Sequence, residues 1–157
     1  CDLPEEYGGM GLDCLTSGIL TEAIAYGDFN VSYIQLLASL LGGIVAQYGS
    51  EEQRQAWLPG LVSGEKMIAL GLTEPGASSD AANLQLKAER QGDDYILNGE
   101  KTSISLADQA DVMVLFARTG PGDSRAKGVT AFLVPLDLPG ITRTHFDDLG
   151  SLIVGRG

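Results

Sequence analysis

Residues that build metal and redox centres are scarce in this chain, which has two cysteines and one histidine among 157 residues. Cys1 and Cys14 stand at no spacing typical of a metal or redox motif, and His145 has too few partners for a zinc site. We therefore expect no bound metal, and we expect free thiols in a reducing compartment.

Basic residues are scarce too, with 10 lysines and arginines against 21 aspartates and glutamates, so the formal net charge is -11. This charge repels nucleic-acid phosphates and anionic membrane surfaces. The sequence also lacks a run of roughly 18 consecutive apolar residues, and its first residues are acidic where a secretory signal would be basic. We expect a soluble, cytoplasmic protein that binds neither nucleic acid nor membranes.

The two ends of the chain differ from those of a complete domain. The first residue is Cys1 and not methionine, and residues 155–157 supply neither a helix end nor a polar tail. We interpret the chain as a piece of a longer protein. Its composition, 44% hydrophobic and 20% charged, is that of a globular protein with a real core.

The apolar pattern divides the chain in two. Within residues 1–64 we expect a helix over residues 12–26, a second that Asn30 caps and Gly49 ends, and a third that opens at Ser50. After that, the pattern is typical of strands. Six are expected, over residues 67–72, 86–90, 95–97, 111–117, 129–136 and 141–146.

Six strands without a helical pattern between them favour an antiparallel barrel or sandwich over a parallel sheet. The predicted fold class is α+β, with an N-terminal helical segment followed by an antiparallel β-barrel domain. We place the domain boundary so that residues 1–64 form an incomplete helical domain and residues 65–157 form the β domain.

Three common catalytic motifs are missing from the sequence. Gly9 and Gly11 lack the third glycine of a dinucleotide-binding fingerprint, since Cys14 stands in its place. Residues 150–157 lack the lysine and hydroxyl residue of a phosphate-binding loop, and there is no Gly-x-Ser-x-Gly elbow. The sequence thus argues against a Rossmann fold, a phosphate-loop enzyme and a serine hydrolase.

One loop of small and hydroxyl residues, residues 72–80, directly follows an apolar strand. Its glycine and alanine let a flat ligand or a phosphate approach the main chain, and its hydroxyls can donate and accept hydrogen bonds. The alternative is a simple β-turn with Pro75 at its second position and Gly76 at its third. The residues alone leave both interpretations open.

Four segments, in the same order, resemble segments of the flavin-dependent acyl-CoA dehydrogenases. Residues 3–12 are similar to that family's Leu-Pro-Glu-Glu-Tyr-Gly-Gly, and residues 48–54 to its Gly-(Ser/Thr)-Glu-Glu-Gln helix start. Residues 72–80 resemble its Thr-Glu-Pro-Gly-Ala-Gly-Ser-Asp, departing at Ser78, and residues 95–101 resemble its Tyr-x-Leu-Asn-Gly-x-Lys. Four ordered segments across nearly the whole chain make this a specific resemblance.

The resemblance implies a helical N-terminal domain, a middle β-barrel domain and a C-terminal four-helix domain, with FAD between the last two. The C-terminal domain is absent from this chain. The implied reaction oxidises an acyl-CoA to the trans-2-enoyl-CoA: a glutamate of that absent domain removes the α-proton, and the β-hydride passes to flavin N5. We therefore assign no catalytic residue here, and we interpret Glu74 as a carboxylate that orients its loop.

The resemblance further implies an electron-transfer flavoprotein as acceptor, a homodimer or homotetramer, and the mitochondrial matrix if the source is eukaryotic. We expect the isolated chain to bind FAD weakly and not to turn over acyl-CoA. Two alternatives stay open. One is a flavin oxidase or monooxygenase of the same fold, and the other is a non-catalytic truncated module whose helical face serves binding or assembly.

Carried over residue by residue, the resemblance also implies a cofactor site. Its members are Leu70, Gly71, Leu72, Thr73, Gly76, Ala77, Ser78, Ser79, Ser103, Ile104 and Ser105. Thr73 would lie near the pyrimidine end of the flavin, and the Ser105 hydroxyl would hydrogen-bond flavin N5. Ser79 would also contact the acyl-CoA substrate.

Three departures from the family pattern indicate a divergent subfamily. Ser103 stands where the family has a tryptophan that packs on the flavin, so most of that apolar contact is lost. Leu106 and Ala107 replace an Asn-Gly pair, and Leu152 replaces an arginine. The alternative for Ser103 is that it only faces solvent on an edge strand.

Overall fold

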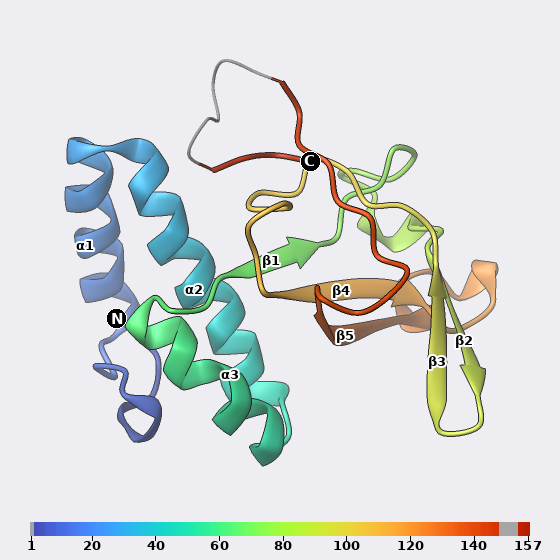
Figure 1. Ribbon diagram of the computed structural model, residues 1–157, viewed down its shortest axis with the longest axis horizontal. Helices are drawn as coiled ribbons and strands as arrows, with labels where there is room; N and C mark the ends of the chain where they lie inside the picture. Colours follow the sequence, from blue (N-terminus) through green and yellow to red (C-terminus); the bar gives the residue numbers. More distant parts are fainter. Residues whose placement is uncertain (1, 148–153) are drawn as a thin grey trace.

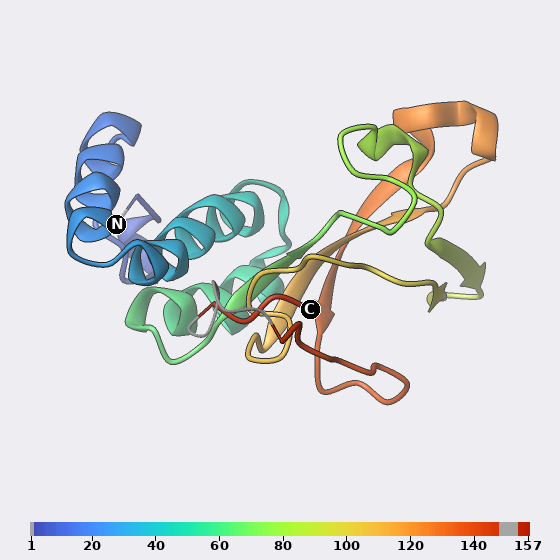
Figure 2. The same ribbon diagram turned by 90° about the horizontal axis from the view of Figure 1, so that it is seen from above.

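The computed structural model describes residues 2–147 and 154–157, in which a helical region leads into a mixed sheet (Figure 1). The helices are α1 (Cys14–Gly27), α2 (Phe29–Tyr48) and α3 (Glu51–Ser63), and the strands are β1 (Ile68–Gly71), β2 (Lys87–Gln91), β3 (Asp94–Asn98), β4 (Val112–Arg118) and β5 (Val129–Pro135). Short 3-10 turns are η1 (Glu5–Tyr7), η2 (Ala81–Asn83) and η3 (Gly122–Gly128). The helices gather at one end of the molecule and the β2–β3 hairpin lies at the other (Figure 2). The predicted order of helices and then strands is confirmed.

Side-chain caps determine where the three helices begin, with Asp13 capping α1 through Thr16 N. Asp28 separates α1 from α2, and its carboxylate accepts hydrogen bonds from Asn30 N at 2.8 Å and Val31 N at 3.4 Å. The prediction that Asn30 caps α2 is therefore wrong: Asp28 has the extended backbone of a cap, and Asn30 already lies in the first turn. Ser50 begins α3 as predicted, with Gln53 completing a capping box.

Strand β4 lies in the middle of the sheet. One edge of β4 pairs antiparallel with β5, while the other pairs parallel with β1 and then, at Arg118, parallel with β2. Strands β2 and β3 form an antiparallel hairpin. The sheet is therefore mixed, and within the described residues it does not close on itself.

The expectation of an antiparallel barrel with six strands is corrected on these points. Strands β1 and β4 run parallel. The connection between them, residues 72–111, contains no α-helix, but it is long enough to bring the chain back to the same end of the sheet. Residues 141–146 form no strand; residues 141–144 line a cavity beside the sheet, and Arg143 Nη1 donates to Ala110 O at 2.8 Å.

Two hydrophobic clusters hold the molecule together. The larger one joins the helices to the sheet, with Leu41 of α2, Leu58 of α3 and Ile68 of β1 all nearly inaccessible to solvent. The smaller one packs the hairpin against the middle of the sheet. Strand β4 contributes Val112 to the first and Leu115 to the second, because alternate residues of a strand face opposite sides.

By length and composition, α2 is also the one helix in the described part of the chain that could cross a membrane, with a mean hydropathy of 1.6. This is weak evidence, since the core helix of a water-soluble protein meets the same criteria. Leu37, Leu41 and Val45 of α2 are in fact buried in the larger cluster. The helix therefore packs one face on the core, while 28% of its apolar 18-residue window is buried.

Candidate functional site

The loop after β1 forms a tight turn. Glu74 N donates to Ala77 O at 2.9 Å, and Ala77 N donates to Glu74 O at 3.1 Å. Pro75 and Gly76 occupy the two central positions and are exposed. The β-turn, one of the two interpretations of this loop, is therefore present, and its tip is exposed, so a ligand could reach it.

The two glycines of this region differ in what the fold demands of them. A Cβ on Gly71 would lie 2.4 Å from Met113 Sδ and 2.7 Å from Leu115 Cδ1, so glycine there leaves room for these two side chains of β4. A Cβ on Gly76 would meet no atom within 4 Å, and Gly76 does not have a left-handed backbone. The fold therefore accounts for Gly71 but leaves the main chain at Gly76 open to a ligand.

The two sequence segments expected to form the cofactor site lie next to each other. Thr102 N donates to Thr73 O at 3.0 Å, and Lys101 Nζ donates to Leu72 O at 3.1 Å. Lys101 Nζ also lies 2.7 Å from Glu74 Oε1. The turn of residues 74–77 is thus joined to the segment that carries Ser105.

Glu74 is buried, and three N–H donors surround its carboxylate. Its carboxylate accepts hydrogen bonds from Lys101 Nζ, from Gln85 N at 2.5 Å and from Leu86 N at 2.9 Å. Burial by itself raises the pKa of this carboxyl, but the hydrogen bonds outweigh it and hold the pKa below its ordinary value. A carboxylate so engaged is a poor general base, which supports its interpretation as a group that orients the loop.

Burial lowers the pKa of the Lys101 ammonium, and the contact with Glu74 opposes that shift. The Lys101 side chain is 6% exposed, and its charge is compensated by the Glu74 carboxylate and the Leu72 carbonyl. The pair is thus a buried, hydrogen-bonded unit between two segments that lie 27 residues apart.

The second segment is held by its main chain. Ile104 N donates to Gly157 O at 2.8 Å, Gly157 N donates to Ile104 O at 3.1 Å, and Leu106 N donates to Val154 O at 3.1 Å. Residues 103–106 therefore run beside the last residues of the chain. Ser103 lies at a bend with φ of 56° and not on an edge strand, although it is exposed, so only half of that alternative is correct.

The expected cofactor residues divide by exposure. Exposed are Gly76, Ser78, Ser79 and Ser103; partly exposed are Leu70, Leu72, Thr73 and Ser105; buried are Gly71, Ala77 and Ile104. Only the first two groups can present side chains to a ligand, or, at Gly76, the main chain. The Ile104 side chain belongs to the larger hydrophobic cluster, so a ligand contact there would have to come from its main chain.

The expected departure at Leu152 lies outside the described residues. The one at Leu106 has a structural consequence. Leu106 is buried with φ of 61°, in the left-handed region that asparagine and glycine tolerate and leucine does not. The asparagine that the family pattern has at this position would suit the backbone better than leucine does.

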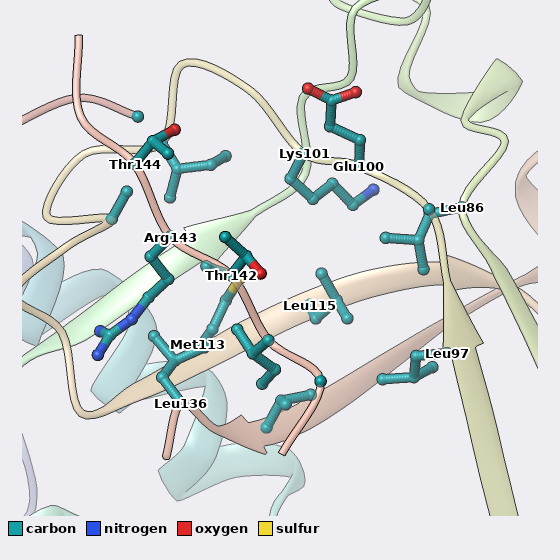
Figure 3. A pocket seen from close by; sticks show the side chains of 17 residues that line it. Leu86, Leu97, Glu100, Lys101, Met113, Leu115, Leu136, Thr142, Arg143 and Thr144 are labelled. Carbon is teal, nitrogen blue, oxygen red and sulfur yellow. The ribbon is translucent and has the colours of Figure 1, made fainter. Parts of the chain in front are cut away.

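Sequence reasoning missed a cavity of about 290 Å³ beside the sheet (Figure 3). Its apolar walls come from strands and the residues that flank them, with Leu97, Met113 and Leu115 among its lining residues, and the extended segment of residues 140–144 closes one side. Of the expected cofactor residues, Ile104 lines it. It is at the small end of ligand pockets, so a dinucleotide would have to bind on the open surface formed by the two joined segments.

Sequence reasoning also missed Arg118, because a single arginine ending an apolar strand carries no motif. The side chain is buried, and its guanidinium donates to Leu84 O at 2.9 Å, Ala82 O at 2.7 Å and Arg125 O at 3.2 Å. It thereby joins η2, just after Ser79, to η3. These hydrogen bonds hold residues 82–84, which follow the turn of residues 74–77 in the sequence.

The two joined segments carry groups with the chemistry that a flavin would need. Hydroxyls of Thr73 and Ser105 come from the two joined segments, while the exposed main chain at Gly76 allows close approach. Such a set can donate and accept hydrogen bonds along the polar edge of a flat ring system.

Comparisons with known proteins agree with this architecture. Residues 1–65 match the family model "Acyl-CoA dehydrogenase, N-terminal domain", and residues 69–152 match "Acyl-CoA dehydrogenase, middle domain". The chain is 42% identical to the human short-chain specific acyl-CoA dehydrogenase, over 94% of this chain and 36% of that protein. It is 41% identical to isobutyryl-CoA dehydrogenase of Dictyostelium discoideum, over 88% of this chain and 33% of that protein.

Solved structures give the same result. A glutaryl-coenzyme A dehydrogenase in complex with glutaryl-CoA superposes with a TM-score of 0.89 at 36% identity, covering 98% of this chain and 40% of that one. A Mycobacterium smegmatis glutaryl-CoA dehydrogenase in complex with FADH2 has a TM-score of 0.86 at 33% identity, over 96% and 38% of the two chains. The chain spans about a third of the length of the curated relatives it matches, and it belongs to the acyl-CoA dehydrogenase family.

Proposed function

We propose that this chain is part of an FAD-dependent acyl-CoA dehydrogenase that oxidises an acyl-CoA to the trans-2-enoyl-CoA. The observation that supports the proposal is the set of hydrogen bonds that joins residues 73 and 74 to residues 101 and 102, since both segments carry residues that we expect to contact the flavin. The names of the relatives support it, since they include short-chain acyl-CoA and glutaryl-CoA dehydrogenases.

In this proposal FAD supplies the hydride acceptor, and the chain's own residues bind and orient it. Thr73 and Ser105 donate hydrogen bonds to the ring, and Gly76 lets the ring approach the main chain. Ser79, which is exposed, contacts the phosphopantetheine arm of the substrate. Holding the substrate and the ring at a fixed distance is the main contribution of this half of the site.

The α-proton is removed by a glutamate of a C-terminal helical domain outside this chain, so the isolated chain binds FAD weakly and has no turnover. We further propose an electron-transfer flavoprotein as electron acceptor and a homodimer or homotetramer as the assembly. The proposed location is the cytoplasm, or the mitochondrial matrix in a eukaryote; the names of several relatives include the word mitochondrial.

A flavin oxidase is the second candidate. The prolyl acyl carrier protein oxidase AnaB superposes with a TM-score of 0.81 at 31% identity, over 92% of this chain and 39% of that one. The same surface would bind the flavin in both cases. The two functions differ in whether oxygen or a protein accepts the electrons.

Assays of the full-length polypeptide that contains this chain distinguish the dehydrogenase from the oxidase. The expected result is turnover of acyl-CoA with reduction of electron-transfer flavoprotein. Formation of one hydrogen peroxide for each acyl-CoA oxidised, with no reduction of that flavoprotein, would favour the oxidase. Purified full-length protein that neither retains nor binds FAD contradicts both candidates.

Gly76 tests the binding surface itself. Gly76→Ala changes the free energy of unfolding by no more than about 1 kcal/mol, because the site is open, but weakens FAD binding as the new methyl group occupies the ring's approach. Gly122→Ala is the matched control, since Gly122 is equally open and lies in η3. Equal FAD dissociation constants for the two variants, measured by flavin fluorescence, would argue against this surface.

A further inference from the structure

A buried ion pair connects the two segments of the surface on which we place the flavin. Lys101 Nζ and Glu74 Oε1 are 2.7 Å apart, and the two side chains are 6% and 5% exposed. The same ammonium donates to Leu72 O at 3.1 Å. Lys101 therefore binds both Leu72, the residue directly after β1, and the turn that follows it.

Glu74 continues this connection into the sheet. Gln85 N and Leu86 N, which donate to the Glu74 carboxylate, directly precede β2. The turn, the segment before Ser103 and the start of β2 thus meet at one carboxylate. A shift of the turn relative to Ser105 would have to break several of these bonds together.

Stability alone is a weak reason for such a pair. Burying two charges is costly, and apolar side chains of similar volume often stabilise a fold as well or better. What an ion pair adds is direction, since its donors and acceptors meet only at defined distances and angles. Here that directional contact lies between the two segments that carry Gly76 and Ser105.

We propose that Lys101 and Glu74 are positioning residues, which set the spacing between residues 74–77 and residues 103–105 and so the pose of the flavin ring. The proposal rests on the proposed function, because it presupposes that this surface binds flavin. Neither side chain touches the reacting atoms. The pair acts through the main chain of the turn and through the segment that follows Lys101.

The test uses the full-length polypeptide with Glu74→Gln, Lys101→Arg and the control Lys66→Met. Lys66 pairs with Asp111 at 3.0 Å, but this second pair is partly exposed and lies outside both segments. The measurements are the FAD dissociation constant, the visible circular dichroism of the flavin at saturation, and thermal unfolding of the apoprotein. The dichroism reports the pose of the ring, which a loss of stability alone does not change.

We expect Glu74→Gln and Lys101→Arg to raise the FAD dissociation constant by about tenfold or more and to change the flavin dichroism. Lys66→Met should change neither. Lys101→Arg keeps both charges and alters only the geometry, so it decides the question alone if Glu74→Gln does not fold.

The outcomes separate the two proposals. Variants that bind FAD as tightly as the wild type, with the same dichroism, overturn the positioning role whatever their melting temperatures. A wild-type polypeptide that binds no FAD overturns the proposed function instead.

Discussion

The turn at residues 74–77 and the segment at residues 103–106 are connected through Lys101 and Thr102, but they are held in different ways. The turn is fixed by side-chain chemistry, through the Glu74 carboxylate and the Lys101 ammonium. The segment is fixed by main-chain hydrogen bonds to residues 154–157 and carries two left-handed residues, Ser103 and Leu106. The comparison teaches that substitutions should act on the turn through lost partners and on the segment through backbone strain.

The largest effect is expected at the turn. Glu74→Ala leaves the Lys101 ammonium and two main-chain N–H groups without their acceptor, so the free energy of unfolding should fall by about 3–5 kcal/mol. Urea unfolding measures the loss. Glu89→Ala, at an exposed position of β2, is the control and should change little. A small loss at Glu74 would show that the ion pair does not hold the turn.

The segment should respond to backbone freedom. Leu106→Ala removes a buried side chain and should cost about 2–5 kcal/mol. Leu106→Gly removes the same side chain but tolerates φ of 61°, so it should be about 1 kcal/mol more stable than Leu106→Ala, the reverse of the usual order. Thermal unfolding of the two variants compares them directly, and an alanine variant that is the more stable would exclude strain at this position.

Acid should lower the stability of the turn by protonating the Glu74 carboxylate. Because the pKa of Glu74 is lowered in the folded protein, its contribution to stability is fully present above its unfolded pKa and is lost as pH falls through the folded value. The wild type should therefore lose more stability than Glu74→Gln below about pH 4.5, the ordinary pKa of a glutamate. Parallel unfolding curves of both proteins from pH 7 to pH 3 test this, and identical acid losses would contradict it.

The smallest effect is expected at Ser103. Ser103→Gly should raise the free energy of unfolding by about 0.5 kcal/mol, since glycine adopts φ of 56° without strain and the side chain is exposed. Ser63→Gly, at the last residue of α3, makes the same chemical change in a helical backbone and should be destabilising. Changes of the same sign in both variants would mean that the Ser103 backbone stores no strain.

Local chemistry made part of this molecule predictable. The helix start at Ser50 and the turn around Pro75 and Gly76 depend on residues only a few positions apart, and both are confirmed. The cap of α2 was misassigned from Asn30 because two capping residues, Asp28 and Asn30, stand close together and only the backbone distinguishes them. The family itself could be inferred from four short segments, and the family models agree with it.

Contacts between distant residues could not be predicted in this way. Nothing near Lys101 in the sequence indicates that its ammonium meets Glu74, and nothing near Arg118 indicates that it joins η2 to η3. The parallel pairing of β1 and β4 was missed because the alternation of apolar residues defines a strand and its faces but not its direction relative to a neighbour.

The amino-acid sequence by itself determined the family and the order of helices and strands, and it offered the tight turn after β1 as one of two interpretations, because each depends on short segments whose side chains act on their own backbone. Only the tertiary structure decided that the sheet is mixed and open in the described residues, that Gly71 serves strand packing while Gly76 stays open, and that a buried ion pair joins the two segments of the proposed flavin surface. The physical reason is that pairing, packing and burial depend on which distant residues meet, and that is fixed when the chain folds as a whole.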